Sequence, residues 1–247
     1  MSSKKKNSDI TPPAKTDAPA TTVSNRDAID MFLTDVRSRP AVETGGARGR
    51  LLFGMDATMS RQPTWDRALQ IQAQMFQETA RIGGLDVQLV YFRGFGECRS
   101  SKWVSDPTSL AALMTKVGCR GGYTQIGKIM SHILREAGRG KINAAVYVGD
   151  AFEENIDAIC QAAGEVGLLG VPMFMFLEGR DPAAERAFRE IARLTRGAFC
   201  HLDEGSAHQL RELLSAVAVY AAGGRKALEN YAESRGGNPA LLLQQLK

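Results

Sequence analysis

The sequence predicts an α/β protein with a doubly wound, mostly parallel central sheet that is flanked by helices and has one antiparallel edge strand. Short apolar runs that end in a polar residue alternate with longer segments of helical periodicity over residues 50–220. Continuous apolar runs are typical of parallel strands that are buried on both faces. The spacing between strand and helix signals is typical of βαβ crossovers, which place helices on both faces of such a sheet.

The strands are predicted from compact apolar runs. Residues 51–55 read Leu-Leu-Phe-Gly-Met and end at Asp56, and residues 144–149 form a similar run that ends at Asp150. The segment 98–104 is more polar and is placed as an edge strand beside the second strand. The predicted strands, in order, are 51–55, 87–92, 98–104, 144–149, 171–177 and 198–201.

The helices are predicted from apolar residues at helical spacing and from their end signals. Gly83 and Gly84 close the helix that begins at Trp65, and the Asp106-Pro107 pair opens the next one. The predicted helices are 65–82, 107–117, 125–137, 155–166, 181–195 and 207–220.

The domain organisation follows from shifts in composition. Residues 1–24 are rich in Lys, Pro, Ala, Thr and Ser, so we expect a disordered basic tail. Residues 25–49 predict a short amphipathic helix and a glycine-rich linker. The α/β domain is placed at 50–228, and residues 229–247 form a C-terminal extension with a short apolar helix.

Composition excludes some classes of function. The chain has 247 residues, 23% of them charged, and a net charge of +4, which gives no bulk-charge support for nucleic-acid binding. No run approaches 18 apolar residues, and no apolar run follows the N-terminal lysines, so we expect neither membrane insertion nor a secretory signal. The four cysteines are far apart in sequence, which favours free thiols and a cytoplasmic location.

Oxygen-bearing side chains follow the predicted strands at one edge of the sheet. Asp56, Thr58 and Ser60 follow the first strand, Asp150 follows the 144–149 strand, and Thr124 precedes the helix at 125. Ligands of open α/β sheets bind at the carboxyl ends of the strands. In an extended loop, alternate residues point the same way, so the first three oxygens are expected to converge.

These five side chains are hard oxygen donors that suit Mg²⁺, Mn²⁺ or Ca²⁺ rather than zinc or copper. Any one of them could instead be an ordinary helix cap. Capping alone explains five such residues at matching strand ends less well than a metal site does. Two further acids, Glu153 and Glu154, are expected either to reach the ion through water or to cap the next helix.

On these residues the chain resembles the von Willebrand factor A (VWA, integrin I-like) domain over about residues 50–220. The metal-ion-dependent adhesion site of that family reads D-x-S/T-x-S, then a Thr, then an Asp after the fourth strand. Asp56, Thr58 and Ser60 match the first element, Thr124 the second and Asp150 the third. The last element departs from the common Thr-Asp-Gly, because here it reads Gly-Asp-Ala.

The resemblance implies a Rossmann-like fold and a non-enzymatic module for metal-dependent protein–protein interaction. Thr58 and Ser60 would ligate Mg²⁺ directly, Thr124 would join them in the ligand-ready state, and Asp56 and Asp150 would hold the ion largely through waters. An open coordination position would then take a Glu or Asp of a partner protein, for example an AAA+ ATPase or an assembly complex. Mn²⁺ and Ca²⁺ remain open as the ion.

Two alternatives stay open. A strand that ends in Asp also suggests a magnesium-dependent, phosphatase-like hydrolase, but the second Asp that such enzymes need is replaced by Thr58. In the other alternative the metal site is vestigial and the C-terminal segment binds the partner. Its leucines at 241, 242, 243 and 246 form an apolar stripe that either docks on another protein or folds back on this domain.

Overall fold

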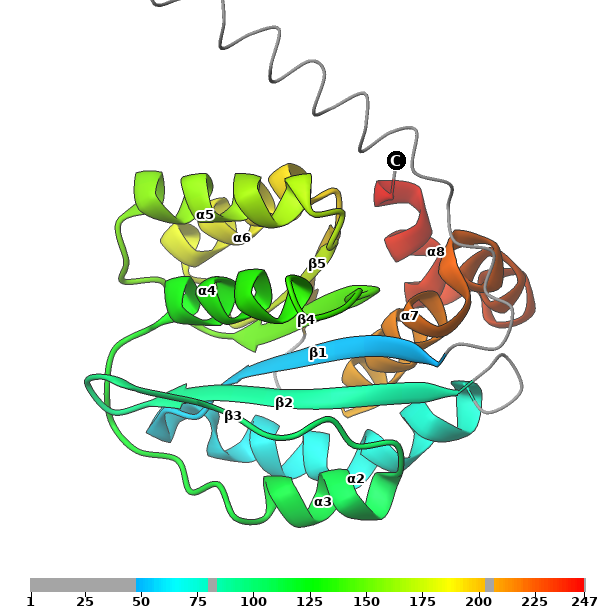
Figure 1. Ribbon diagram of the computed structural model, residues 1–247, viewed down its shortest axis with the longest axis horizontal. Helices are drawn as coiled ribbons and strands as arrows, with labels where there is room; N and C mark the ends of the chain where they lie inside the picture. Colours follow the sequence, from blue (N-terminus) through cyan, green and yellow to red (C-terminus); the bar gives the residue numbers. More distant parts are fainter. Residues whose placement is uncertain (1–47, 80–83, 203–206, 247) are drawn as a thin grey trace, which may run out of the picture. The chain divides into compact units, whose positions relative to one another are not determined.

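A six-stranded sheet forms the centre of the protein in a computed structural model that describes residues 48–79, 84–202 and 207–246 (Figure 1). The strand order is β3-β2-β1-β4-β5-β6, and only β3 runs antiparallel to its neighbour. The predicted tail at 1–24 and helix at 25–37 lie outside the described residues. The strands are β1 (Gly49–Asp56), β2 (Leu85–Arg93), β3 (Glu97–Ser100), β4 (Ala144–Gly149), β5 (Met173–Glu178) and β6 (Ala198–Leu202).

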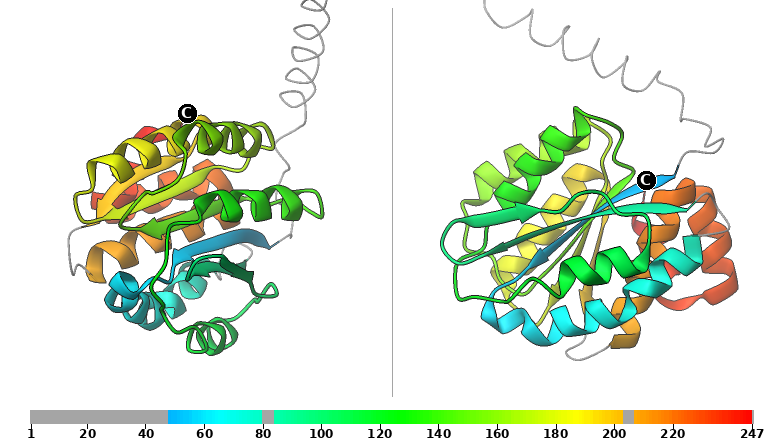
Figure 2. Two further views of the ribbon diagram at one scale, coloured as in Figure 1. Left: turned by 90° about the vertical axis from the view of Figure 1, so that its left-hand side faces the viewer. Right: turned by 60° about the horizontal axis from the view of Figure 1, so that its bottom comes forward.

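Helices cover both faces of the sheet, so the prediction of a doubly wound α/β fold is confirmed (Figures 1 and 2). On one face lie α2 (Gln62–Thr79), α3 (Pro107–Met114) and α7 (Ala207–Arg235). On the other face lie α4 (Ile126–Ala137), α5 (Ile156–Leu168) and α6 (Pro182–Thr195). A 3-10 turn, η1 (Met59–Arg61), precedes α2, and α8 (Gly237–Gln245) follows α7.

The apolar side chains of β1 contribute to the hydrophobic cores on both faces of the sheet. Leu51, Phe53 and Met55 pack with α2, α3 and α7, while Leu52 packs with the core under α4, α5 and α6. All four side chains are 0% exposed. A strand that is buried on both faces therefore accounts for the unbroken apolar run in the sequence.

The strand order places a topological switch point at the carboxyl ends of β1 and β4. The chain passes from β1 outward to β2 and β3, then returns to β4 on the other side of β1. The loops after β1 and β4 therefore leave toward opposite faces of the sheet, which opens a crevice between them. The crevice is where Asp56 and Asp150 lie.

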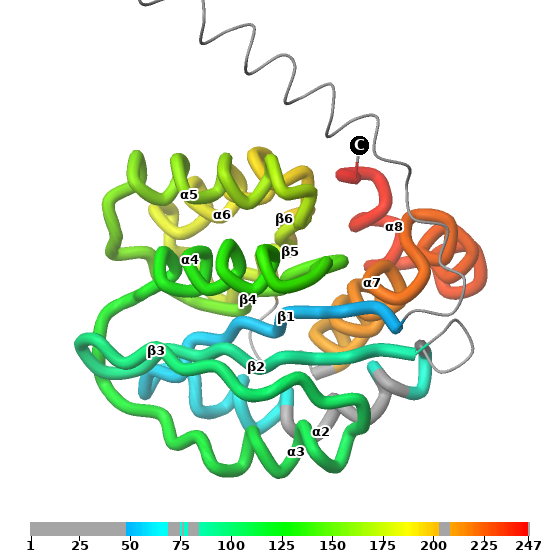
Figure 3. The backbone as a smooth tube through the Cα atoms, in the orientation of Figure 1, coloured from blue at the N-terminus to red at the C-terminus, as the bar shows by residue number. Residues whose placement is uncertain are grey.

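The C-terminal segment folds back on the domain (Figure 3). Leu242 and Leu246 are buried in the core with α7, and the Gln245 amide exchanges hydrogen bonds with the Phe199 backbone on β6. The helix predicted at 207–220 continues to Arg235 beyond a kink at Gly224, where φ is +69°. Glycine tolerates this backbone angle, so the two glycines at 223 and 224 bend the helix instead of ending the helical segment.

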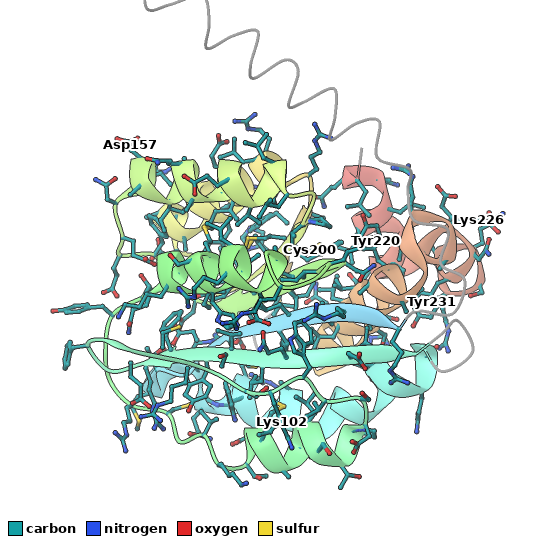
Figure 4. All side chains as sticks on the ribbon, viewed as in Figure 1. Lys102, Asp157, Cys200, Tyr220, Lys226 and Tyr231 are labelled. Carbon is teal, nitrogen blue, oxygen red and sulfur yellow. The ribbon has the colours of Figure 1, made fainter. Side chains whose placement is uncertain are left out.

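Side chains near the C-terminal segment are partly buried or exposed according to the side of α7 on which they lie (Figure 4). Cys200 and Tyr220 pack against the core between the sheet and the C-terminal helices, whereas Lys226 lies on the outer side of α7. Burial raises the pKa of the Cys200 thiol to about 11. All four cysteines of the chain are free.

No helix among the described residues is both long and apolar enough to cross a bilayer.

Candidate metal centre at the switch point

Asp56 is the last residue of β1 and sets the shape of the loop that follows. Its side chain is buried, with 1% exposed, and Oδ1 accepts the backbone N–H of Thr58 at 2.7 Å. This local hydrogen bond turns the chain, and Met59–Arg61 continue as a 3-10 turn. Thr58 has extended backbone angles, but the 3-10 turn begins at Met59, so the expectation of an extended loop is wrong beyond Thr58.

The turn nevertheless places two of the predicted hydroxyls side by side. Thr58 Oγ1 and Ser60 Oγ lie 3.3 Å apart. Although Thr58 precedes a helical turn, its side chain makes no capping hydrogen bond. The Thr58 hydroxyl is thus not used as a helix cap, and it faces Ser60.

Thr124 reaches the same place from the loop before α4. Its hydroxyl accepts the backbone N–H of Glu153 at 2.9 Å, and the Glu153 carboxylate accepts the backbone N–H of Thr124 at 3.0 Å. This reciprocal pair ties the Thr124 loop to the loop after β4, where Asp150 follows the strand directly. The Asp150 side chain keeps 26% of its surface exposed, so a carboxylate remains accessible from solvent.

All five predicted side chains line one cavity of about 280 Å³. Those side chains are Asp56, Thr58, Ser60, Thr124 and Asp150. The structure therefore brings together the five predicted metal ligands. The other lining residues are Met59, Gly121, Gly122, Ala151 and Glu153.

Burial makes the charge on Asp56 unfavourable in the absence of a cation. Desolvation raises its pKa to about 6, the negative charge of Asp150 adds to the rise, and the hydrogen bonds from Thr58 and the charge of Arg61 oppose it. The pocket thus holds a carboxylate whose ionised form gains more than usual from a nearby positive charge.

A buried arginine, which the sequence analysis missed, lies beside the pocket. Arg61 is 2% exposed and pairs with Glu178 at the end of β5, with 2.6 Å between Nη1 and Oε2. Its Nη1 is also 3.9 Å from Asp150 Oδ2, and its Nε and Nη2 make no hydrogen bond. The Thr64 hydroxyl and Arg67 also bind Glu178. Glu178 thus ties the loop after β1 to β5.

Of the two acids after β4, Glu154 caps a helix, but it is α4 and not the next helix along the chain, α5. Glu154 accepts the backbone N–H groups of Ile126 at 2.6 Å and Gly127 at 3.0 Å, which lie in the first turn of α4. The following helix, α5, is capped by Asn155. The first N–H groups of a helix lack partners within the helix, and carboxylates there also interact favourably with its dipole.

The donor set suits a hard divalent cation. Two carboxylates and three hydroxyls offer only oxygen, the ligand type that Mg²⁺, Mn²⁺ and Ca²⁺ prefer. Within residues 48–79, 84–202 and 207–246, no three side chains of His, Cys, Asp or Glu form a metal-binding group. A cation at this position would depend on hydroxyl oxygens as well as on the two aspartates.

Comparisons with known proteins show similarity at the level of the fold. No family model and no curated protein matches the sequence. Among solved structures, a mutant of the PilB minor pilin from Streptococcus sanguinis gives a TM-score of 0.55 at 11% identity, over 78% of this chain and 64% of the pilin chain. The VWA domain of SpRpn10 gives 0.52 at 14% identity, over 72% of this chain and 98% of that domain.

A third similar structure is proximal thread matrix protein 1 from the mussel byssus, with a TM-score of 0.54 at 15% identity, over 72% of this chain and 47% of that protein. At these identities the similarity is one of fold. The chain has a VWA-like, Rossmann-like architecture, and the five oxygen-bearing side chains of the cavity lie at its switch point.

Proposed function

We propose that this protein is a non-enzymatic protein-interaction module in which a divalent cation, expected to be Mg²⁺, bridges the cavity and an acidic side chain of a partner protein. One observation carries the proposal: Asp56, Thr58, Ser60, Thr124 and Asp150 come from three loops and line a single cavity. These five oxygen-bearing side chains match the sequence pattern of a metal-ion-dependent adhesion site, and the VWA-like fold supports the comparison.

The physical basis is charge. Asp56 is nearly fully buried, and its pKa is raised mainly by desolvation, so a cation in the cavity would stabilise its ionised form. The bound ion would act as a Lewis acid with a position left for an outside ligand. Mg²⁺ usually keeps several water ligands, and one of them can be replaced by a carboxylate oxygen.

The hydrolase alternative receives less support from the residues of the cavity. Two residues after Asp56, where a proton-donating carboxylate would be needed, the chain has Thr58. The hydroxyl of Thr58 lies against that of Ser60, and the Glu154 carboxylate is bound to two backbone N–H groups of α4. The solved structures of similar fold include a pilin and a thread matrix protein, which also favours an interaction role.

The scaffold alternative loses its proposed docking element. Leu242 and Leu246 of the apolar stripe are buried against this domain, and Gln245 is bonded to the β6 backbone. Leu241 remains 51% exposed, which leaves a single leucine on the outer face.

Affinity capture tests the proposal. The wild-type chain and the Asp56→Ala variant are immobilised and exposed to native lysate in magnesium or in EDTA, with Asp157→Ala as the control. Asp157 is an exposed acid on α5 (Figure 4). We expect partners that wild type and Asp157→Ala retain only in magnesium and that Asp56→Ala does not retain. Identical partners under all conditions would contradict the metal bridge.

A further inference from the structure

Three large apolar side chains in and beside the loops of the candidate metal cavity are exposed to solvent. Met59 is 63% exposed, Tyr123 59% and Phe95 81%. Met59 lies between two of the predicted ligands, Tyr123 directly precedes a third, and the rings of Phe95 and Tyr123 meet edge to face at 5.3 Å. The other large hydrophobic side chains that are exposed in the described part of the chain are Ile156, Leu168, Leu169 and Leu241. We call Met59, Phe95 and Tyr123 the apolar rim.

Specific contacts hold the two aromatic residues of the rim in their exposed positions. Phe95 is at the tip of the β2–β3 hairpin, between two glycines. Gln125 Nε2 donates to the Gly94 carbonyl at 3.1 Å, and Lys128 Nζ donates to the Gly96 carbonyl at 2.7 Å. The hairpin tip is thereby fixed to the start of α4.

The loop that carries Tyr123 is fixed against the same hairpin. Gly122 approaches Gly94 so closely that a Cβ built on Gly122 would lie 2.0 Å from the Gly94 carbonyl oxygen. Thr124, on the other side of Tyr123, is bound to Glu153. The exposed aromatic pair is therefore preorganised, which lowers the entropy lost when a partner binds.

We propose that the apolar rim is a second part of the partner site and takes a large aliphatic or aromatic side chain next to the partner's acidic residue. This inference rests on the proposed function, in which the cation takes the carboxylate. Carboxylates are common on protein surfaces, so a metal alone selects few partners, whereas an adjoining apolar contact adds selectivity.

An apolar rim would also strengthen the interaction between the cation and the partner's carboxylate. Methionine and aromatic residues are enriched in protein interfaces, and apolar contacts around a polar centre exclude water. Excluding water lowers the local dielectric constant and strengthens the attraction between a cation and a carboxylate. A partner segment in which Glu or Asp has a large apolar neighbour would satisfy the cavity and the rim together.

Two labelled peptides test this inference. Both have one central Glu, which is flanked by Phe and Leu in the first peptide and by Ser on both sides in the second. Fluorescence anisotropy measures the binding of each peptide to the full chain in millimolar magnesium and in EDTA. The variants are the double substitution Phe95→Ser with Tyr123→Ser and the control Leu241→Ser, whose leucine is also about half exposed. Thermal unfolding checks that each variant is folded.

We expect the Phe/Leu peptide to bind wild type and Leu241→Ser about tenfold tighter than the Ser peptide, and the rim variant to lose this preference. Equal affinities for wild type, no binding of either peptide to the magnesium-loaded protein, or a preference that survives in the rim variant would each overturn the inference. Self-association of wild type that the rim variant loses would assign the rim to a second copy and also overturn it.

The same experiment separates this inference from the proposed function. If EDTA leaves both affinities unchanged while the Phe/Leu preference persists, the rim is supported and the metal bridge is contradicted. If EDTA abolishes the binding of both peptides but wild type shows no preference between them, the bridge stands and the rim is wrong.

Discussion

Replacing Glu178 with Gln tests the buried ion pair that supports the cavity. The Arg61 guanidinium is 2% exposed, and its nearest carboxylate is Glu178 at 2.6 Å, with Asp150 farther away at 3.9 Å. Glutamine keeps the shape of the side chain and one carbonyl acceptor but removes the charge. The substitution therefore leaves a buried cation that lacks its main counterion.

The expected loss of stability follows from this geometry. Removing one partner of a buried ion pair costs about 3–5 kcal/mol. Asp150 remains near Arg61, so we expect the lower end, about 3 kcal/mol. For a protein of this size, each kcal/mol lowers the melting temperature by about 2–4 °C, which gives a fall of roughly 6–12 °C.

Urea unfolding followed by circular dichroism measures the free energy directly. The control is Glu190→Gln, because Glu190 pairs with Arg193 on the surface of α6, where both side chains are at least a third exposed. The control is expected to cost less than about 1 kcal/mol. Equal losses in the two variants would refute the inference that the Arg61–Glu178 pair is a buried, stabilising contact.

The same variant has a predicted pH dependence. Burial alone would raise the pKa of Glu178, but the Thr64 hydroxyl, Arg61 and Arg67 outweigh it and lower the pKa below the ordinary 4.5. The stabilisation from a lowered carboxyl pKa is present above that ordinary value and is lost as pH falls through the folded-state value. The difference between wild type and Glu178→Gln should therefore narrow below pH 4.5.

Three further predictions concern the loops of the cavity. Gly122→Ala places a Cβ 2.0 Å from the Gly94 carbonyl oxygen, so its free energy of unfolding in urea should be about 1–3 kcal/mol lower than that of wild type. Gly121→Ala is the control, because a Cβ at Gly121 meets open space, and its free energy of unfolding should not fall in this way. Glu154→Gln should lower thermal stability by about 1 kcal/mol because two N–H groups of α4 lose a charged cap, and an unchanged melting temperature would contradict the capping role. In EDTA at pH 7, Asp56→Asn should raise the free energy of unfolding by about 2–3 kcal/mol, since the folded-state pKa of about 6 lies above the ordinary 3.8. This gain should vanish below pH 3.8, where the aspartate is protonated in both states, and a loss of stability at pH 7 would contradict it.

The sheet and the location of the cavity could be predicted because both depend on local pattern. Residues 51–55 are apolar without interruption because β1 is buried on both faces. Since the carboxyl ends of parallel strands meet at one edge, Asp56 and Asp150 could be placed near each other without coordinates. The path of the loop between Asp56 and Ser60 could not be predicted, because it depends on a hydrogen bond from Thr58 that turns the chain.

Long-range contacts account for what the sequence analysis missed. Arg61 resembles any polar residue at the start of a helix, and its burial depends on Glu178, which is far away in sequence. One signal was present, because Glu178 is a third acid at the end of an apolar strand, like Asp56 and Asp150. Capping of the next helix, one of the two roles expected for Glu154, was wrong because the loop after β4 meets the start of α4, a contact that only the tertiary fold creates.

The most direct test of the metal centre is calorimetric titration of Mn²⁺ into the metal-free chain. Wild type and Asp157→Ala are expected to bind one ion per chain, in competition with Mg²⁺. Thr124→Val removes a hydroxyl and Asp150→Ala removes a carboxylate, each from a different loop of the cavity, and each should weaken binding at least about tenfold. A wild-type chain that binds no Mn²⁺, or variants that bind it as tightly as wild type, would contradict the assignment of a cation to these five residues.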